Sequence, residues 1–181
     1  EVCKTTIQLL KNENADILST LHAPDFPTGG QLIYNENELK HIYETGRGNI
    51  KVRAKYRYDE KNNCIEIYEI PYTTNIEAIM DKIFAVVKSG KIRDITDVRD
   101  ETDLNGLKIT IDVKRNTKAD LLMHRLYQMT PLSDTFNCNF NILIDSKPMT
   151  LGVRSILKYW INFRISSIKN QLEFDISKKS E

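Results

Sequence analysis

The chain has 181 residues, a length that allows one domain or one domain with an appendage. Hydrophobic residues make up 40% and charged residues 28% of it, as in ordinary globular proteins, which argues against intrinsic disorder. The longest uninterrupted apolar run, residues 83–87, is far shorter than the roughly 20 residues of a membrane-spanning helix, and no secretory signal opens the chain. We interpret the sequence, which lacks an initiator Met and ends on a charged tail, as part of a longer protein.

The net charge of +1 by itself indicates no class of partner. Cysteine usage is more informative, because Cys3, Cys64 and Cys138 are more than 60 positions apart and form no C-x-x-C pair. An odd and sparse set of this kind fits reduced thiols in a cytoplasm better than a disulfide framework or a zinc site. We expect each cysteine to be a small buried hydrophobe.

The N-terminal third predicts short helices separated by an irregular segment. Residues 1–22 read as two short helices. Residues 23–30 contain two prolines and a Gly pair, which exclude regular structure and mark a boundary. A further helix is expected over 36–44, ending at Gly46, where left-handed backbone costs glycine little.

The clearest strand covers residues 50–58, which alternate between apolar and basic side chains. A polar turn leads to a second strand over 64–70, so the pair predicts a hairpin. Thr74 and Glu77 have the spacing of a capping box, and the helix that they begin is expected to end at Gly90.

The remaining elements complete an α+β pattern. We expect a charged loop through Asp103, a strand over 107–113, a helix over 117–129, a fourth strand over 136–144 and an exit turn over 145–148. A helix from Thr150 to at least Leu172 would exceed 30 Å at ~1.5 Å per residue. The predicted fold is a four-stranded sheet with packed helices, in the order β-β-α-β-α-β, followed by a long helix that begins a coiled-coil arm.

Basic residues are concentrated in two places. Five of them, with no acid between, are Arg47, Lys51, Arg53, Lys55 and Arg57. The last four would share one strand face at a spacing of about 6.6 Å, close to every second phosphate of a DNA strand. A second acid-free set on the last helix and the turn before it comprises Lys147, Arg154, Lys158, Arg164 and Lys169. The alternative is that both sets are solvated faces paired with acids elsewhere in the fold.

Catalytic signatures are sparse. The three histidines, His22, His41 and His124, form no metal-ligand pattern, and the sequence contains neither a P-loop nor a G-x-S-x-G elbow. The acids between Asp94 and Asp103 are interleaved with Arg93 and Arg99, which favours internal ion pairs over a metal site. Trp160 is expected to pack on the apolar side of the last helix.

Four blocks carry a resemblance to a known family. They are Pro24-Asp25-Phe26-Pro27-Thr28-Gly29-Gly30, Tyr43-Glu44-Thr45-Gly46-Arg47-Gly48, Glu69-Ile70-Pro71-Tyr72 and Arg99-Asp100-Glu101-Thr102-Asp103. In this order and spacing, the chain resembles the A subunit of bacterial type IIA topoisomerases, DNA gyrase and topoisomerase IV. The resemblance covers the whole chain.

The resemblance implies a division into three segments. Residues 1–22 would be the tail of the winged-helix DNA-cleavage domain, 23–148 the tower domain and 149–181 the start of the coiled-coil exit-gate arm. In the family, the first two domains form a positive cradle for the gate DNA. Compared with many relatives, the segment 31–37 carries one extra residue.

The resemblance also implies where the chemistry lies. The family nucleophile is a tyrosine after an arginine, upstream of residue 1, so Arg57-Tyr58 on the tower strand only mimics it and this chain would hold no catalytic residue. The Mg²⁺ and ATP sites of the family belong to the B subunit. No metal or cofactor is expected in this chain.

The leading hypothesis is therefore part of a DNA breakage-reunion subunit that holds gate DNA through Arg47, Lys51, Arg53, Lys55 and Arg57. The implied partners are duplex DNA, a second copy of the A subunit, and the B subunit, in the cytoplasm at the nucleoid, with no membrane. Two alternatives are an RNA-binding module that uses Tyr56 and Tyr58, and a scaffold that assembles through the long helix. The first is disfavoured because both tyrosines alternate onto the apolar face, away from the basic residues.

Overall fold

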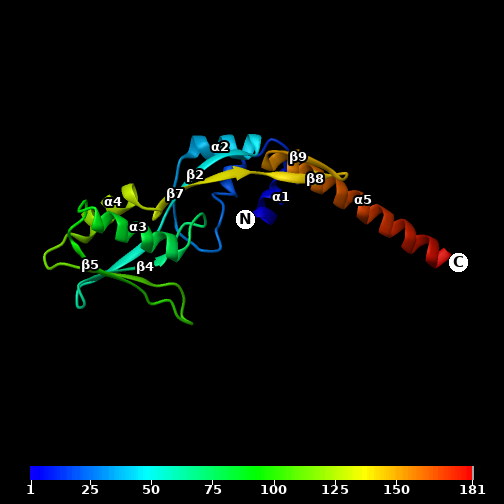
Figure 1. Ribbon diagram of the computed structural model, residues 1–181. Coiled ribbons are helices and arrows are strands. Elements are labelled where there is room, and N and C mark those ends of the chain that lie inside the picture. Colours follow the sequence, from blue (N-terminus) through cyan, green and yellow to red (C-terminus); the bar gives the residue numbers. More distant parts are fainter. Residues whose placement is uncertain (181) are drawn as a thin grey trace. The chain divides into compact units, whose positions relative to one another are not determined.

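The computed structural model describes residues 1–180 and divides into two compact units (Figure 1). One unit combines Glu1–Pro24 and Asn35–Asn49 with the chain from Asn137 onward. The other combines Asp25–Tyr34 with Ile50–Phe136. We call them the helical-arm unit and the sheet unit. Each is described by itself.

The sheet unit contains a four-stranded antiparallel sheet. Its strands are β3 (Lys55–Asp59), β4 (Cys64–Glu69), β5 (Ile95–Asp100) and β6 (Ile109–Val113), in the spatial order β3-β4-β6-β5. Side chains alternate across the sheet, so Ile65 and Ile67 of β4 lie on the same face as Ile109 and Ile111 of β6. All four of these isoleucines are fully buried, and each contributes about 1.5–3 kcal/mol by leaving water.

Two helices cover this apolar face (Figure 1). They are α3 (Ile76–Lys88), which buries Ile79 and Ile83, and α4 (Ala119–Met129), which buries Met123 and Leu126. Their apolar residues recur every three or four positions, as expected for a helix with one buried side. The predicted α+β class, with a four-stranded sheet, packed helices and a final long helix, is confirmed.

The predicted strand over 50–58 is in fact two strands. Residues up to Arg53 belong to β2 (Arg47–Arg53), which lies between β1 (Gln31–Ile33) and β7 (Ser133–Asn139). At Ala54, which is fully buried and donates its N–H to Leu132 O at 2.7 Å, the chain passes from that sheet to β3. An alternating pattern shows which side chains are buried but not which strand is the partner. The alternation over residues 50–58 continues across Ala54, so it does not reveal that the chain changes sheet there.

Two further expectations are corrected. The loop expected before Asp103 contains β5, whose buried residues Ile95 and Val98 are three apart because a register shift lies between Ile95 and Asp97. That irregularity breaks the period of two. The expected strand over 136–144 is divided between β7 and β8 (Asn141–Ile144), and residues 147–148 of its expected exit turn belong to β9 (Lys147–Thr150). Strand β5 therefore occupies the fourth place in the main sheet.

The helical-arm unit contains α1 (Val2–Lys11), a 3₁₀ turn (Ile17–Ser19), α2 (Glu36–Thr45), the β8–β9 hairpin and α5 (Val153–Ser180). Its small core combines Leu9, Ala15 and Leu157. The 28 residues of α5 span about 42 Å, and Leu157 is its one buried residue among those described. Trp160, expected to pack, is 51% exposed.

Helix ends show one prediction confirmed and one wrong. Gly46 ends α2 in the left-handed conformation, with φ 76°. The capping box at Thr74 does not form. The side chain of Asn75 accepts the N–H of Ala78 at 2.8 Å instead, so α3 begins one residue later than the box requires.

Candidate nucleic-acid interface

The predicted phosphate-binding residues are distributed over two strands. Arg47, Lys51 and Arg53 lie on β2, and Lys55 and Arg57 lie on β3. Arg47 belongs to the helical-arm unit and the other four to the sheet unit. The expected single row of cations on one strand is therefore not formed.

Lys51 and Arg47 are the exposed cations of β2. Lys51 has neither an ion pair nor a side-chain hydrogen bond within residues 1–180, so its ammonium is available to a phosphate. Arg47 donates from Nη2 to Thr150 Oγ1 at 3.4 Å, a neutral contact that leaves its charge uncompensated. These two residues retain the character that the sequence predicted.

Arg53 is partly buried. Its guanidinium lies 5.1 Å from the ring centre of Tyr127, and Tyr127 in turn donates its hydroxyl to Ala54 O at 2.7 Å. A cation held over an aromatic face in this way supports the packing where β2 ends. Arg53 therefore joins β2 to α4 and is less accessible than Lys51.

Lys55 is paired with an acid across the hairpin. Its ammonium lies 3.0 Å from Glu69 Oε2, and the same carboxylate accepts the N–H of Gly30 at 2.6 Å. Burial raises the pKa of Glu69, but the Gly30 N–H and the Lys55 ammonium outweigh that effect and hold the pKa below its usual value. The carboxylate is charged at neutral pH and compensates Lys55.

Arg57 is paired in the same way. It donates to Glu66, which lies directly opposite on β4, and Glu66 also receives the ammonium of Lys108 at 2.9 Å. Hydrogen bonds from Lys108 and Arg57 lower the pKa of Glu66 although its burial opposes them. These acids lie on the partner strand of the hairpin, 9 and 14 residues after the cations that they neutralise, so residues 47–57 taken alone show no compensation.

The ion pairs continue across the open face of the sheet. Lys108 lies 3.0 Å from Glu101, and Arg99 pairs with Glu101, Asp97 and Asp112. The internal pairing expected for the acidic segment is confirmed at Arg99. The open face of the four-stranded sheet is consequently a mixed-charge network and not a positive surface.

The second basic set, near and on α5, is partly engaged. Arg154 donates to the carbonyls of Glu13 and Ala15, the latter at 2.7 Å, and Lys158 lies 3.2 Å from Glu13 Oε2. These bonds tie α5 to the end of α1. For Arg164 and Lys169, residues 1–180 contain no ion-pair partner.

Residues with the potential for other chemistry are held in structural contacts. Asp59, Cys64 and Glu66 bring ligand atoms within 4.8 Å of one another, but Glu66 is occupied by two cations. Burial, with the nearby acids, raises the pKa of the Cys64 thiol, so the thiolate that binds metals is disfavoured. Cys64 and Cys138 are buried free thiols as predicted, whereas Cys3 is exposed.

The tyrosines of β3 are not free base-stacking groups. Tyr56 donates to Asp120 at 2.7 Å, and Tyr58 donates to Asn63 Oδ1 at 2.6 Å. Burial and the bond to Asp120 raise the pKa of Tyr56. Both side chains are fixed at the edge of the hairpin.

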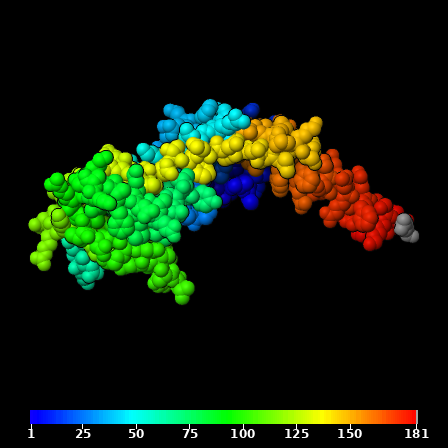
Figure 2. Space-filling model, viewed as in Figure 1, coloured from blue at the N-terminus to red at the C-terminus, as the bar shows by residue number. Residues whose placement is uncertain are grey.

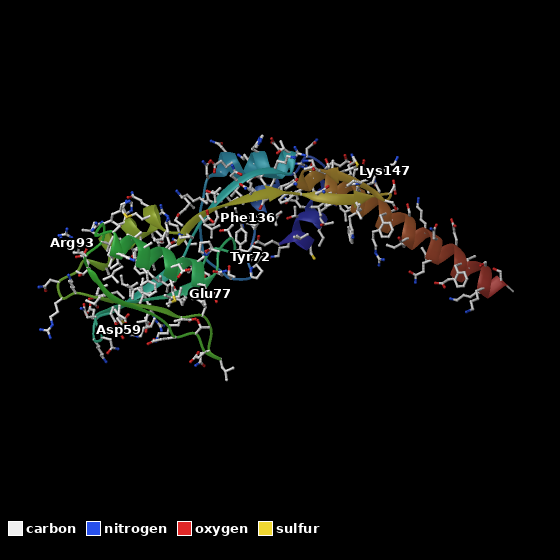
Figure 3. The ribbon with its side chains drawn as sticks, viewed as in Figure 1. Asp59, Tyr72, Glu77, Arg93, Phe136 and Lys147 are labelled. Atoms are coloured by element: carbon white, nitrogen blue, oxygen red, sulfur yellow. The ribbon has the colours of Figure 1, made fainter. Side chains whose placement is uncertain are left out.

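Two of the sequence blocks meet in the sheet unit. Gly30, from the Pro-Asp-Phe-Pro block, donates to Glu69 of the Glu-Ile-Pro-Tyr block, and a Cβ on Gly29 would collide with the same carboxylate. The ring of Phe26 stacks on Tyr72 with ring centres 6.4 Å apart and meets Phe136 edge-on with ring centres 4.9 Å apart. Figure 3 labels Tyr72 and Phe136, whose ring centres are 6.3 Å apart. The glycines and aromatics of these blocks are therefore required by close packing around the end of β4.

Within residues 1–180, no helix has an apolar stretch long enough to cross a membrane.

Comparison with known proteins places the whole chain in one family. The family model for the A subunit of DNA gyrase and topoisomerase IV matches residues 1–181. The chain is 36% identical to the DNA gyrase A subunit of Borreliella burgdorferi, with 100% of the chain and 23% of that protein aligned. It is 37% identical to the DNA gyrase A subunit of Clostridium acetobutylicum, over 99% of the chain and 22% of that protein.

A plant relative is similar to the same extent. The chloroplastic/mitochondrial DNA gyrase A subunit of Arabidopsis thaliana is 35% identical over 98% of the chain and 19% of its own length. The chain thus spans about a fifth of the length of the curated relatives that it matches. With a match over its full length, the chain belongs to the family formed by the A subunits of DNA gyrase and topoisomerase IV.

Proposed function

We propose that this chain is part of the DNA breakage-reunion subunit of a type IIA topoisomerase, in which it holds and positions the gate duplex. The observation that carries the proposal is the full-length family match, together with the uncompensated cations Arg47 and Lys51 on β2. In the whole enzyme, the reaction is ATP-dependent passage of one duplex through another. Mg²⁺ and ATP would act through the B subunit, the nucleophilic tyrosine would lie upstream of Glu1, and two A subunits would form the dimer in a cytoplasmic, nucleoid-associated enzyme.

We propose that Arg47, Lys51, Arg53, Lys55 and Arg57 form the interface and contribute to it unequally. Lys51 and Arg47 would contact phosphates directly, since neither has an ion pair with an acid among residues 1–180. Lys55 and Arg57 would contribute less, because Glu69 and Glu66 neutralise them and would also repel a phosphate. Arg53 would act mainly by fixing the end of β2 on Tyr127.

The long helix favours an assembly role beside DNA binding. Its exposed apolar side chains include Trp160, Phe163, Leu172 and Phe174, which are 51–67% exposed. A helix of about 42 Å with so little burial is suited to pairing with another helix. We propose that α5 begins the coiled-coil arm of the exit gate.

A salt series on DNA binding tests the proposal. Binding of the chain to a ~30-base-pair duplex would be measured between 50 and 200 mM salt, beside a variant with Lys51→Glu, Arg53→Glu and Lys55→Glu. If about four phosphates are met, the logarithm of the affinity falls with slope near −3.6, so the affinity drops roughly 10²-fold over this range. The variant is expected to bind the duplex much more weakly than the unmodified chain.

A matched control and the contrary outcomes make the test specific. Lys82→Glu, an exposed lysine of α3 outside the interface, is expected to leave binding and slope nearly unchanged. A flat salt response of the unmodified chain would contradict DNA holding and favour the scaffold. Tighter binding to single-stranded RNA than to the duplex would favour the RNA-binding alternative.

A further inference from the structure

One end of the four-stranded sheet carries a dense group of exposed cations. This end holds the turn from α3 to β5 and the turn from β6 to α4, because the start of β5 pairs with the end of β6 through Ile95 and Val113. We call the group the basic end, and it consists of Lys88, Lys91, Arg93, Lys114, Arg115 and Lys118, all of which are exposed. No single stretch of the sequence reveals this group, because its residues come from two separate segments.

The two turns are fixed to one another. The N–H of Lys114 bonds to Asp94 O at 2.8 Å, which joins the end of β6 to the start of β5. Arg125 of α4 donates to the carbonyl of Lys91 and lies 3.5 Å from the Asp94 carboxylate. The backbone of the basic end is thus a defined surface and not a pair of independent loops.

Charge is not balanced on these two turns, although the β3–β4 turn at the same end of the sheet adds Asp59 and Glu60. Asp94 is the acid of the two turns, and it is already engaged by Arg125. Within residues 1–180, none of the six basic-end side chains has an ion pair. The open face of the same sheet is the opposite case, since Arg57, Lys108 and Arg99 are each matched with a carboxylate.

The other end of the sheet is acidic. The end of β5 and the turn that follows it carry Asp100, Glu101 and Asp103, and Figure 2 shows this turn (green) projecting from the sheet unit away from the 114–118 turn (yellow-green). Figure 3 labels Arg93 at the basic end. Six clustered like charges repel one another, and that cost is offset when an anionic partner lies over them.

We infer that the basic end is a second contact surface for the phosphate backbone of duplex DNA, separate from Lys51 on β2. This inference rests on the proposed function. Asp59, the last residue of β3, lies at the same end of the sheet as the basic end. Even a fully extended chain from Lys51 to Asp59 would span only about 26 Å, the length of roughly 8 base pairs, so one short duplex can reach both surfaces. The basic end thus extends DNA contact beyond the proposed interface on β2 and β3.

The surface chemistry favours DNA over an acidic protein segment. Protein interfaces are organised around buried apolar and aromatic anchors. On the two turns, the exposed side chains are Lys, Arg, Ser, Asn and glycine backbone, and Leu121 just inside α4 is the exposed large apolar residue nearest to them in the chain. A surface of cations without apolar anchors is suited to binding a phosphate backbone, whose contacts are charged and polar.

The first experiment compares charge-reversed variants on a ~30-base-pair duplex. The basic-end variant carries Lys91→Glu, Arg93→Glu, Lys114→Glu and Arg115→Glu, and it is expected to bind at least about tenfold more weakly at 50 mM salt. Its salt slope should be smaller in magnitude than that of the unmodified chain, by about 0.9 for each phosphate contact that is lost. Lys51→Glu, measured in parallel, reports on the interface already proposed.

The outcomes separate the two proposals. If the unmodified chain fails to bind the duplex, the proposed function itself fails. If it binds and Lys51→Glu weakens binding while the basic-end variant matches the unmodified chain in affinity and slope, the basic end is not a DNA contact. Binding of a poly-glutamate peptide as tight as that of the duplex at equal salt would overturn DNA in favour of an acidic protein partner.

A second measurement needs no variant and therefore does not depend on the variant's folding. The unmodified chain would be acetylated on lysine with and without the duplex, and the modified sites quantified by mass spectrometry. DNA is expected to protect Lys88, Lys91, Lys114 and Lys118 at least about threefold, whereas Lys82 on α3 should react equally in both states. Equal reaction of the four basic-end lysines with and without bound DNA would overturn the inference.

Discussion

Arg57 on β3 donates to Glu66, the residue directly opposite it on β4. The register continues this pair across the sheet, since Glu66 lies opposite Thr110 on β6 and Thr110 lies opposite Arg99 on β5. Glu66 and Thr110 are 8% and 2% exposed, so the middle of the row is largely removed from water. A residue that the sequence presents as a free cation is therefore one end of a cross-strand network.

Removal of the central acid should destabilise the sheet unit. In Glu66→Ala, the cations Arg57 and Lys108 lose their shared carboxylate, and the free energy of unfolding is expected to fall by about 1–3 kcal/mol. Urea denaturation followed by circular dichroism measures the change. Glu77→Ala is the matched control, because Glu77 is exposed on α3, and an equal loss in both variants would contradict a role for the network.

Stability should fall in acid. Hydrogen bonds from Thr110 and Lys108 lower the pKa of Glu101 from 4.5 to about 2, and the pKa of Glu66 is also lowered. Since the folded state favours the charged carboxylates, their contribution is complete above about pH 4.5 and is lost as the pH falls toward 2. The free energy of unfolding, measured in urea at several pH values, should decrease over this range and decrease less steeply in Glu101→Gln. If the free energy of unfolding of the variant decreased as steeply with falling pH, Glu101 would not contribute to the acid dependence.

The N-terminus of α3 provides a paired test of capping. Asn75→Ala removes the acceptor for the Ala78 N–H and is expected to lower the free energy of unfolding by about 1 kcal/mol. Thr74→Ala, one residue earlier, should have little effect because Thr74 does not cap the helix. A larger loss at Thr74 than at Asn75 in thermal or urea unfolding would restore the capping box that the sequence suggested.

Glycine at the end of α2 is required for two separable reasons. Gly46→Ala places a Cβ on a residue with φ 76° and against the carbonyl of Leu151, so we expect a loss of at least about 2 kcal/mol. Gly90→Ala has nearly the same φ, 75°, but no neighbouring atom within 4 Å, and should cost about 1 kcal/mol. Equal losses in urea unfolding would show that the close approach to Leu151 is unimportant.

The cations of the proposed interface should not be equivalent in DNA binding. Lys51→Ala removes a cation with no ion pair in the described chain, so affinity for a ~30-base-pair duplex should fall several-fold and the salt slope should shrink by about 0.9. Arg57→Ala removes a cation that Glu66 already neutralises, and its effect on affinity should be smaller. Fluorescence anisotropy at two salt concentrations distinguishes them, and a larger effect at Arg57 would mean that DNA displaces Glu66.

Local sequence patterns were sufficient to predict an element where the interactions that determine it are made between residues close together in the chain. The helices α2, α3 and α4 were predicted, and so was the left-handed end of α2 at Gly46, because helix hydrogen bonds and caps are made between near neighbours. The β3–β4 hairpin was predicted because its strands are consecutive. The capping residue of α3 was missed by one position, since Thr74 and Asn75 both have side chains able to cap.

Strand partners and charge compensation were not available from local patterns. Whether residues 50–58 stay in one sheet depends on Leu132, which receives the N–H of Ala54 from more than 70 positions away in the chain. The strand β5 was hidden because its register shift breaks the alternation of Ile95 and Val98. Both features depend on pairing between segments that are distant in the chain.

The sequence by itself determined the family, through the four ordered blocks and the match over the full length. It also determined the α+β class and the basic residues of the segment 47–57, which depend on the order of residues and short-range periodicity. The tertiary structure alone decided which cations are compensated by a neighbouring acid. It brings Glu66 and Glu69 beside Arg57 and Lys55, and it gathers Arg93 and Lys114 at one end of the sheet. Lys51 has no ion pair within the described residues 1–180. The physical reason is that Coulomb interactions act through space at a few ångströms, so the neighbours that matter are those assigned by the fold and not by the chain.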